Sequence, residues 1–185
     1  MRPIQRLFII AFFAATVFGL TAIEVTAQQV AHPAPPVALD GYSYKYSPRG
    51  QIHLFLCKAP KCGPGSKVSY SLSGPEKNPD FEAFKSRAKT VVSLLQPRLP
   101  QGTTLKIGTQ EKLEEPAFTT FTSYREMQLA NGIEQVTKSA MVYAENLTIS
   151  IISSAENKET ADGNQAAFLL GLLTWSEIEK HKESR

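Results

Sequence analysis

Cys57 and Cys62 are the residues whose type and spacing most clearly indicate a chemistry. They are the only two cysteines of the chain. An even pair so close in sequence most simply forms a disulfide in an oxidising compartment, and the chain-entropy model assigns about 2 kcal/mol to such a short closed loop. Redox activity is an alternative, because Lys58 and Lys61 would favour a thiolate, although the spacing is not Cys-x-x-Cys. A metal site is another, but two thiols lack the further ligands of tetrahedral zinc.

A basic rim around the cysteine loop is the second candidate site. Lys58, Lys61 and Lys67 would form it, with Lys45 and Arg49 as further members. Such a rim attracts anionic partners such as membrane lipids or acidic glycans, and the alternative is a solvated basic loop. The glycine-rich run 63–67 lacks the Walker spacing and leads into a predicted strand, so it does not predict a phosphate loop.

The remaining titratable residues give no catalytic pattern. His53 is the only histidine inside the predicted fold, no Gly-x-Ser-x-Gly motif is present, and an ordinary strand residue is expected. Glu111, Glu114 and Glu115 lie in a charged run, where paired-carboxylate catalysis is conceivable but a solvated turn is commoner. The sequence therefore predicts no catalytic, cofactor-binding or metal-binding residue.

The first 27 residues have the pattern of an export signal. Arg2 and Arg6 precede the apolar run 7–20, and Val25-Thr26-Ala27 supplies small residues for cleavage. A membrane anchor is the alternative, because the apolar stretch extends to Ile23 and approaches the roughly 17–25 residues of a spanning helix. A cleaved signal peptide, Met1–Ala27, predicts a periplasmic or secreted protein with no stable membrane span after cleavage.

The length and the net charge of the chain limit the number of domains and the classes of partner. After a proline-rich, flexible lead-in at 28–40, residues 41–183 are long enough for a single domain with its own hydrophobic core. The formal net charge is only +3 at pH 7, and such a small excess does not predict nucleic-acid binding.

Alternating and β-branched segments predict a mainly antiparallel sheet. Residues 51–57 place Ile52, Leu54 and Leu56 on one face, residues 68–72 alternate in the same way, and 103–107 form another short strand. The charged run 110–115 is expected to be a loop. Asn131-Gly132 predicts a two-residue turn between long segments at 117–130 and 133–144, and 147–153 suits a central strand.

Two helices complete the predicted elements. Asn78 is the expected N-cap of the first, with Pro79 in its first position, and its apolar stripe ends before Pro97. The second covers 155–183, with Phe168 and Leu172 on its apolar face. The fold class predicted is α+β: an antiparallel meander with a long hairpin, packed by two helices as an α/β/α sandwich.

The element order resembles a known family. A helix opening at Asn78-Pro79 after short strands, and a buried strand (LTISIIS) running into a helix with Ala166-Ala167-Phe168, are similar to the PsbP-like α/β/α sandwich family. Members include an extrinsic photosystem II subunit and bacterial envelope proteins. The resemblance covers roughly 42–178 and implies an accessory or binding role, but it carries no functional residue across.

These observations together predict an exported cell-envelope protein that is a non-enzymatic binding or accessory module. Its partner would be another protein of the envelope, bound through the sheet face or through the hairpin tip near Met127, Leu129 and Ile133. The alternative function is a thiol-dependent or hydrolytic enzyme centred on the Cys57–Cys62 loop.

Overall fold

One antiparallel sheet forms the centre of the described part of the chain. The computed structural model describes residues 33–63 and 65–183, so the predicted signal peptide lies outside the described residues. The strands are β1 (Tyr42–Ser47), β2 (Ile52–Cys57), β3 (Lys67–Ser73), β4 (Thr104–Glu115), β5 (Phe118–Gln128), β6 (Glu134–Ala144) and β7 (Thr148–Ala155). Their spatial order is β1-β2-β3-β7-β6-β5-β4, and every neighbouring pair is antiparallel.

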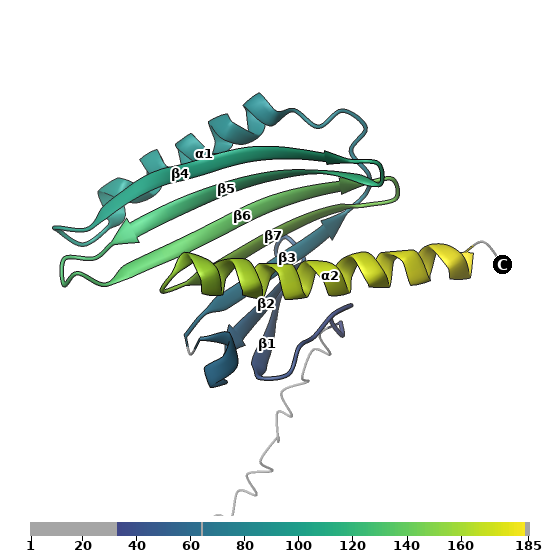
Figure 1. Ribbon diagram of the computed structural model, residues 1–185, viewed down its shortest axis with the longest axis horizontal. Coiled ribbons are helices and arrows are strands. Elements are labelled where there is room, and N and C mark those ends of the chain that lie inside the picture. Colours follow the sequence, from purple (N-terminus) through teal and green to yellow (C-terminus); the bar gives the residue numbers. More distant parts are fainter. Residues whose placement is uncertain (1–32, 64, 184–185) are drawn as a thin grey trace, which may run out of the picture. The chain divides into compact units, whose positions relative to one another are not determined.

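Two long helices connect and cover the strands. Helix α1 (Phe81–Leu95) carries the chain from β3 to β4 at the opposite edge, and the meander β4 to β7 then returns until β7 pairs with β3 (Figure 1). Helix α2 (Lys158–Glu183) follows β7. Neither α1 nor α2 has the length and apolar character that a bilayer-crossing helix requires.

The two helices lie on opposite faces of the sheet. On β6, Ala140 and Val142 belong to the core cluster under α2, which contains Phe168 and Leu172. The alternate residue Tyr143 joins Phe84 of α1 and Phe121 of β5 in a separate cluster. Because neighbouring strand residues point to opposite faces, the molecule is an α/β/α sandwich, which confirms the predicted fold class.

The larger core lies on the α2 side. Phe168 of α2 packs its ring 4.7 Å from Phe55 of β2 and 5.1 Å from Tyr42 of β1, measured between ring centroids. Ile149 and Ile151 of β7 are completely buried in the same cluster. Aromatic and β-branched side chains fill this interior with large apolar areas, and they hold α2 against the sheet.

Several local predictions differ from the structure. Residues 42–47, which carry no predicted element, form β1. Residues 110–115, predicted to be a loop, continue β4 and pair with β5 as far as Glu115 opposite Phe118. This strand is at the sheet edge, where charged side chains remain solvated and also discourage pairing with another chain. Asp80 rather than Asn78 caps α1, and its carboxylate accepts from the N–H groups of Glu82 and Ala83 at 2.8 and 3.1 Å.

The predicted hairpin is present with a longer turn. Residues 129–133 connect β5 to β6, and the Leu129 N–H donates to the Ile133 carbonyl at 2.8 Å. Gly132 has φ 83°, a left-handed conformation that glycine adopts without strain. The Asn-Gly pair therefore marks the reversal, while the backbone forms a wider loop than the two-residue turn expected.

Part of the proline-rich lead-in is fastened to the core. The Tyr70 hydroxyl donates to the Val37 carbonyl at 2.9 Å and lies 3.2 Å from the Val37 nitrogen. The Val37 side chain packs over α2 at Gly171, where an added Cβ would lie 2.7 Å from Val37 Cγ1. The glycine at this helix position thus allows the lead-in to approach the helix backbone closely.

Candidate functional site

The two cysteines form a buried disulfide. Cys57 ends β2, Cys62 lies in the short turn Pro60–Cys62, and their Cα atoms are 5.9 Å apart. The side-chain amide of Asn164 on α2 donates to the Cys62 carbonyl at 2.9 Å. With exposures of 2% and 5%, the joined sulfurs offer no thiolate to a substrate. The pair therefore fastens its loop beside α2, and nothing in this arrangement favours the thiol-enzyme alternative.

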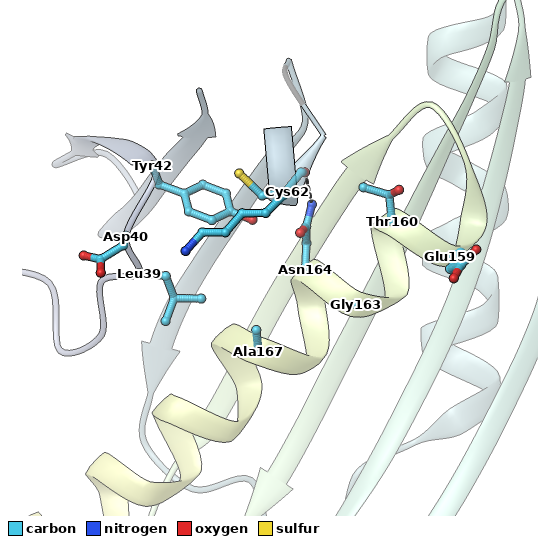
Figure 2. Close-up of a pocket in the computed structure, with 10 residues that line it drawn as sticks. Leu39, Asp40, Tyr42, Cys62, Glu159, Thr160, Gly163, Asn164 and Ala167 are labelled. Atoms are coloured by element: carbon cyan, nitrogen blue, oxygen red, sulfur yellow. Dashed lines mark hydrogen bonds between the residues drawn. The ribbon is translucent and has the colours of Figure 1, made fainter. Parts of the chain in front are cut away.

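A pocket of about 660 Å³ lies between this loop, the lead-in and the first turns of α2. Figure 2 shows Asp40 and Tyr42 on one side of the pocket and Asn164 and Thr160 on the other. Lys61 lines it together with two carboxylates, Asp40 and Glu159. The charged residues that line the pocket have both signs, so the pocket does not favour an anionic ligand.

The lysines of the predicted basic rim are not gathered on one side of the molecule. Lys61 lines the pocket beside α2. Lys67 is in β3 next to Val68, which is completely buried on the α2 side, so Lys67 points to the α1 side. Lys58 follows β2 and is exposed. Anion binding by these three lysines stays a prediction.

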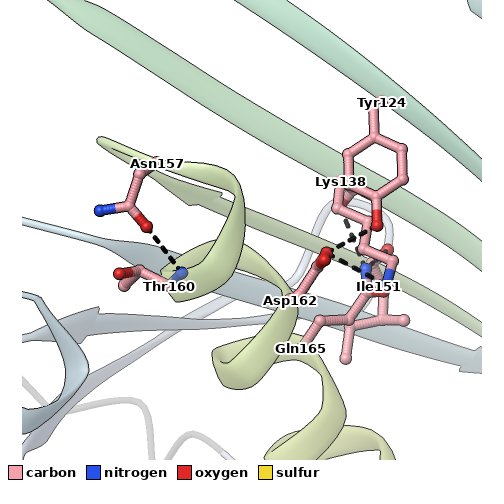
Figure 3. Close-up of polar contacts among 7 residues, drawn as sticks. All are labelled: Tyr124, Lys138, Ile151, Asn157, Thr160, Asp162 and Gln165. Carbon is pink, nitrogen blue, oxygen red and sulfur yellow. Dashed lines mark hydrogen bonds and ion pairs between the residues drawn. The ribbon is translucent and has the colours of Figure 1, made fainter. Parts of the chain in front are cut away.

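A polar cluster joins the start of α2 to the sheet. The Tyr124 hydroxyl donates to Asp162 Oδ1 at 2.7 Å, and Lys138 Nζ lies 3.2 Å from the same oxygen (Figure 3). The Gln165 amide donates to the Lys138 carbonyl at 3.1 Å. Burial, reinforced by the hydrogen bond to Asp162, raises the pKa of Tyr124. A phenol held protonated as a donor is suited to positioning α2, not to acting as a base.

His53 lies in an aromatic stack. Its ring is 4.9 Å from that of Tyr70 and 5.9 Å from that of Tyr44, and Nδ1 lies 2.9 Å from the Tyr44 hydroxyl oxygen. Burial lowers the pKa of His53. The contacts are those of a core strand residue, as the sequence predicts.

The predicted acidic run does not form a carboxylate pair. Glu114 and Glu115 are neighbours in β4 and therefore point to opposite faces of the sheet. Glu114 is 2.6 Å from Lys112 Nζ. In the described part of the chain, no group of three His, Cys, Asp or Glu residues could hold a metal ion.

The α1 side of the sheet is only partly covered. Helix α1 packs on β4 and β5 and lies along that edge in Figure 1. On β2, His53, Phe55 and Cys57 are buried, whereas Ile52 and Leu54 are 38% and 36% exposed. On β7, Ile151 is buried and Ile152 is 36% exposed. Apolar side chains therefore face solvent across the strands that α1 leaves bare.

We name this surface the open face. It consists of the α1-side residues of β1, β2, β3 and β7 other than the buried Thr148: Ser43, Lys45, Ser47, Ile52, Leu54, Leu56, Lys67, Ser69, Ser71, Ser73, Ser150, Ile152 and Ser154. Small hydroxyl residues surround the apolar ones, and the two charged members, Lys45 and Lys67, are both exposed cations. No carboxylate is among these strand residues. The surface is partly apolar and basic.

A groove of about 240 Å³ continues the open face beneath α1. We name it the Arg125 groove. Its lining comprises Phe84, Arg87, Ala88, Val91, Ser123, Arg125, Ser139, Met141, Ser150 and Ile152. Ser150 and Ile152 belong to both surfaces, so the groove opens onto the open face.

Sequence reasoning did not find the open face or the Arg125 groove. One signal was available: residues 52–57 are apolar or aromatic at almost every position, which indicates a strand contacted on both faces. The groove combines residues of α1, β5, β6 and β7. No local pattern reveals such a combination.

The geometry defines an antiparallel α/β/α sandwich with one incompletely covered sheet face. No protein-family model matches the chain, and no curated protein matches it. Among solved structures, it is similar to the Ran-binding protein Mog1p of Saccharomyces cerevisiae, with 14% identity over 63% of this chain and 69% of that chain, and a TM-score of 0.39.

It is also similar to cyanobacterial PsbP from Synechocystis, with 9% identity over 74% of this chain and 92% of that chain, and a TM-score of 0.40. A solved PsbP structure is thus among those that this chain is similar to, as the element order of the sequence suggests. Likeness of this degree carries no function from either protein to this chain.

Proposed function

We propose that this chain is an exported, non-enzymatic binding or accessory protein of the cell envelope that holds a protein partner on its open face. In this proposal Met1–Ala27 is a cleaved signal peptide, 28–40 is the lead-in, and 41–183 is the single functional domain. The observation that carries the proposal is the solvent exposure of Ile52, Leu54 and Ile152 on one continuous sheet face.

Apolar exposure supplies the driving force for binding. Covering these three side chains would remove apolar area from water, which contributes about 25 cal/mol per Å² buried before the costs of association. The side chains of the seven serines on the open face are short, so a partner can approach the strands closely. Exposed apolar patches with a polar margin are typical of protein interaction sites.

Charge selects the partner. Lys45 and Lys67 are exposed on the open face, and its strand residues include no acid. A protein segment with acidic side chains beside apolar ones would complement both properties. The surface lacks the exposed aromatic residues that settle into a bilayer interface, so we favour a protein over a membrane.

The disulfide supports the proposed location. A buried disulfide between Cys57 and Cys62 persists in oxidising compartments and is rare in the cytosol. A periplasmic or secreted protein is consistent with this bond and with the signal pattern at the N-terminus.

Site-specific photocrosslinking in the producing cells tests the proposal. A photoreactive residue at position 54 should give an adduct with one envelope protein. The matched control places the same residue at position 170, because Leu170 on α2 is also apolar and is 69% exposed but lies away from the open face. We expect no such adduct from position 170.

A substitution then tests whether the apolar side chain of Leu54 contributes to partner binding. Leu54→Glu should abolish recovery of the crosslinked protein in a pull-down, and Leu170→Glu should leave it unchanged. Equal recovery with both variants would contradict the proposal. So would an adduct with lipid or with a second copy of this chain, because each would identify a different occupant of the open face.

A further inference from the structure

The Arg125 groove contains a charged side chain that has no partner among residues 33–63 and 65–183. Arg125 follows Tyr124, whose side chain lies on the α2 side, so Arg125 points to the α1 side and lines the groove. Its side chain is half-buried, and no hydrogen bond or ion pair joins the guanidinium to any residue that the structure describes. A guanidinium carries five N–H donors in a rigid fork, and none of those of Arg125 meets an acceptor among the described residues.

The other lining residues do not compensate this charge. Phe84, Ala88, Val91, Met141 and Ile152 form apolar walls. Arg87, the second cation, is exposed and directs its Nε at the Ala83 carbonyl of its own helix at 3.4 Å. No acid lines the groove.

Burial accordingly lowers the pKa of Arg125. Placing an arginine between apolar walls without a counter-charge costs desolvation energy that an anion would offset. The positive charge of Arg125 is therefore not balanced by any residue that lines the groove.

We propose that the Arg125 groove binds an organic carboxylate with a short apolar tail. The carboxylate pairs with the guanidinium of Arg125, and the tail lies between α1 and the sheet against Val91, Met141 and Ile152. Planar carboxylates match the guanidinium fork with two parallel N–H···O bonds. The hydroxyls of Ser139 and Ser150 line the same groove and provide further donors.

Size and charge restrict the ligand class. A volume of about 240 Å³ is below the roughly 300–1,000 Å³ of drug-sized sites, so the apolar part is short or extends onto the open face. Arg125 is half-buried whereas Arg87 is exposed to solvent, so the unbalanced charge inside the groove is that of Arg125, which favours a monocarboxylate over a phosphate dianion. The apolar walls also select against small hydrophilic anions.

This inference goes beyond the proposed function. The carboxylate site needs no protein partner, and it can be measured on the isolated protein. Photocrosslinking at position 54 and ligand titration of the groove can therefore fail separately.

Amide-detected NMR titration with hexanoate tests the site on protein purified after export by the producing cell. We expect saturable shift changes at residues of α1, β5, β6 and β7 that line the groove. Hexanol and hexylammonium keep the tail and remove the negative charge, and we expect their affinities to be lower by roughly tenfold or more. Inorganic phosphate, which lacks the tail, should bind equally weakly.

Two variants test the roles of the charge and of the groove. Arg125→Gln should weaken hexanoate binding by roughly tenfold or more, whereas Arg49→Gln, an exposed arginine in the β1–β2 turn, should leave it unchanged. Ala88→Phe, which fills the groove and leaves Arg125 in place, should also abolish binding. This second variant keeps the test decisive if Arg125→Gln impairs folding.

Several results would overturn the inference. If hexanol bound as tightly as hexanoate, the negative charge would not contribute to binding. If phosphate bound as tightly as hexanoate, the apolar tail would not contribute. Shift changes confined to residues outside the groove, or unaltered hexanoate affinity in Ala88→Phe, would place the ligand elsewhere.

Discussion

The packing around His53 makes the stability of the folded protein depend on pH. Its imidazole is stacked on Tyr70 and contacts Tyr44 and Tyr46. The Tyr44 hydroxyl donates to the Pro33 carbonyl at 2.9 Å, so it receives the Nδ1–H of a neutral His53. Three aromatic rings and no carboxylate surround this histidine in the described contacts, and burial lowers the pKa of His53 below its ordinary 6.5.

The stability of the protein should therefore decrease on mild acidification. In the unfolded chain His53 takes up a proton near pH 6.5, whereas the folded protein resists protonation until a lower pH. The contribution of His53 is fully present above about pH 6.5 and is lost as pH falls towards the folded-state pKa. Urea midpoints measured between about pH 7 and pH 5 should fall, and the fall should be smaller in His53→Gln. An identical pH slope in both proteins would rule out His53 as its source.

At the scale of elements, α2 is held by apolar packing along its middle and by polar contacts at its start. Phe168 and Leu172 are completely buried against the sheet. The Tyr124 to Asp162 hydrogen bond and the Asn157 side chain, which accepts from the Thr160 N–H at 2.8 Å, define where the helix begins. Helix α1 buries Phe84 near its start, but its later apolar residues Val91, Leu94 and Leu95 remain exposed.

Removing the Tyr124 hydroxyl should weaken the attachment of α2. Tyr124→Phe retains the ring and loses a hydrogen bond to a charged acceptor, so we expect the free energy of unfolding to fall by about 1.5 kcal/mol. Urea denaturation measures this change. Glu145→Gln is the matched control, because it removes the negative charge from an exposed ion pair with Lys180 at 2.6 Å and should have no measurable effect. Equal stability of Tyr124→Phe and wild type would show that packing alone positions the helix.

At the scale of the whole molecule, the disulfide reinforces one corner of a fold that has an independent core. Cys57 and Cys62 close a loop of six residues beside α2. The main cluster, which includes Phe55, Tyr70 and Phe168, extends across the sheet and does not depend on that loop for its contacts. The disulfide should therefore add stability locally, while the chain should fold without it.

Thiol chemistry can check this conclusion. The native protein should show no free thiol in titration, and the double variant Cys57→Ala/Cys62→Ala should remain folded with a free energy of unfolding lower by about 2 kcal/mol. Circular dichroism and urea denaturation give the two readouts. Two reactive thiols in the native protein would reopen the enzyme alternative, and complete unfolding of the variant would show that the loop is essential to the fold.

Local patterns predicted most elements because each depends on nearby residues. The alternation Val68, Tyr70, Leu72 correctly identifies the core face of β3, and the stripe through Phe168 and Leu172 identifies that of α2. In β4 the prediction failed beyond Ile107, because the charged residues there remain solvated on an edge strand. Pairing with β5, which no local signal encodes, keeps those residues extended.

Which of its two faces a strand buries is not determined by the local pattern that predicts the strand. Ile52, Leu54 and Leu56 share one face of β2, as their spacing requires, yet α2 covers the opposite face and buries His53 and Phe55. Both faces of β2 are apolar enough to be a core face, so alternation alone does not choose between them. The choice depends on which helix packs there.

The amino-acid sequence by itself determined the α+β class, the two helices, the cysteine pair and the basic and apolar residues available for binding, because periodicity, capping and composition act over a few residues. Only the tertiary structure decided that α1 covers β4 and β5 and leaves the open face bare. It also placed Arg125 beside α1 in a groove whose described lining includes no acid. Both results arise from contacts between segments far apart in the chain, where the free energy of packing depends on the whole arrangement and not on any local pattern.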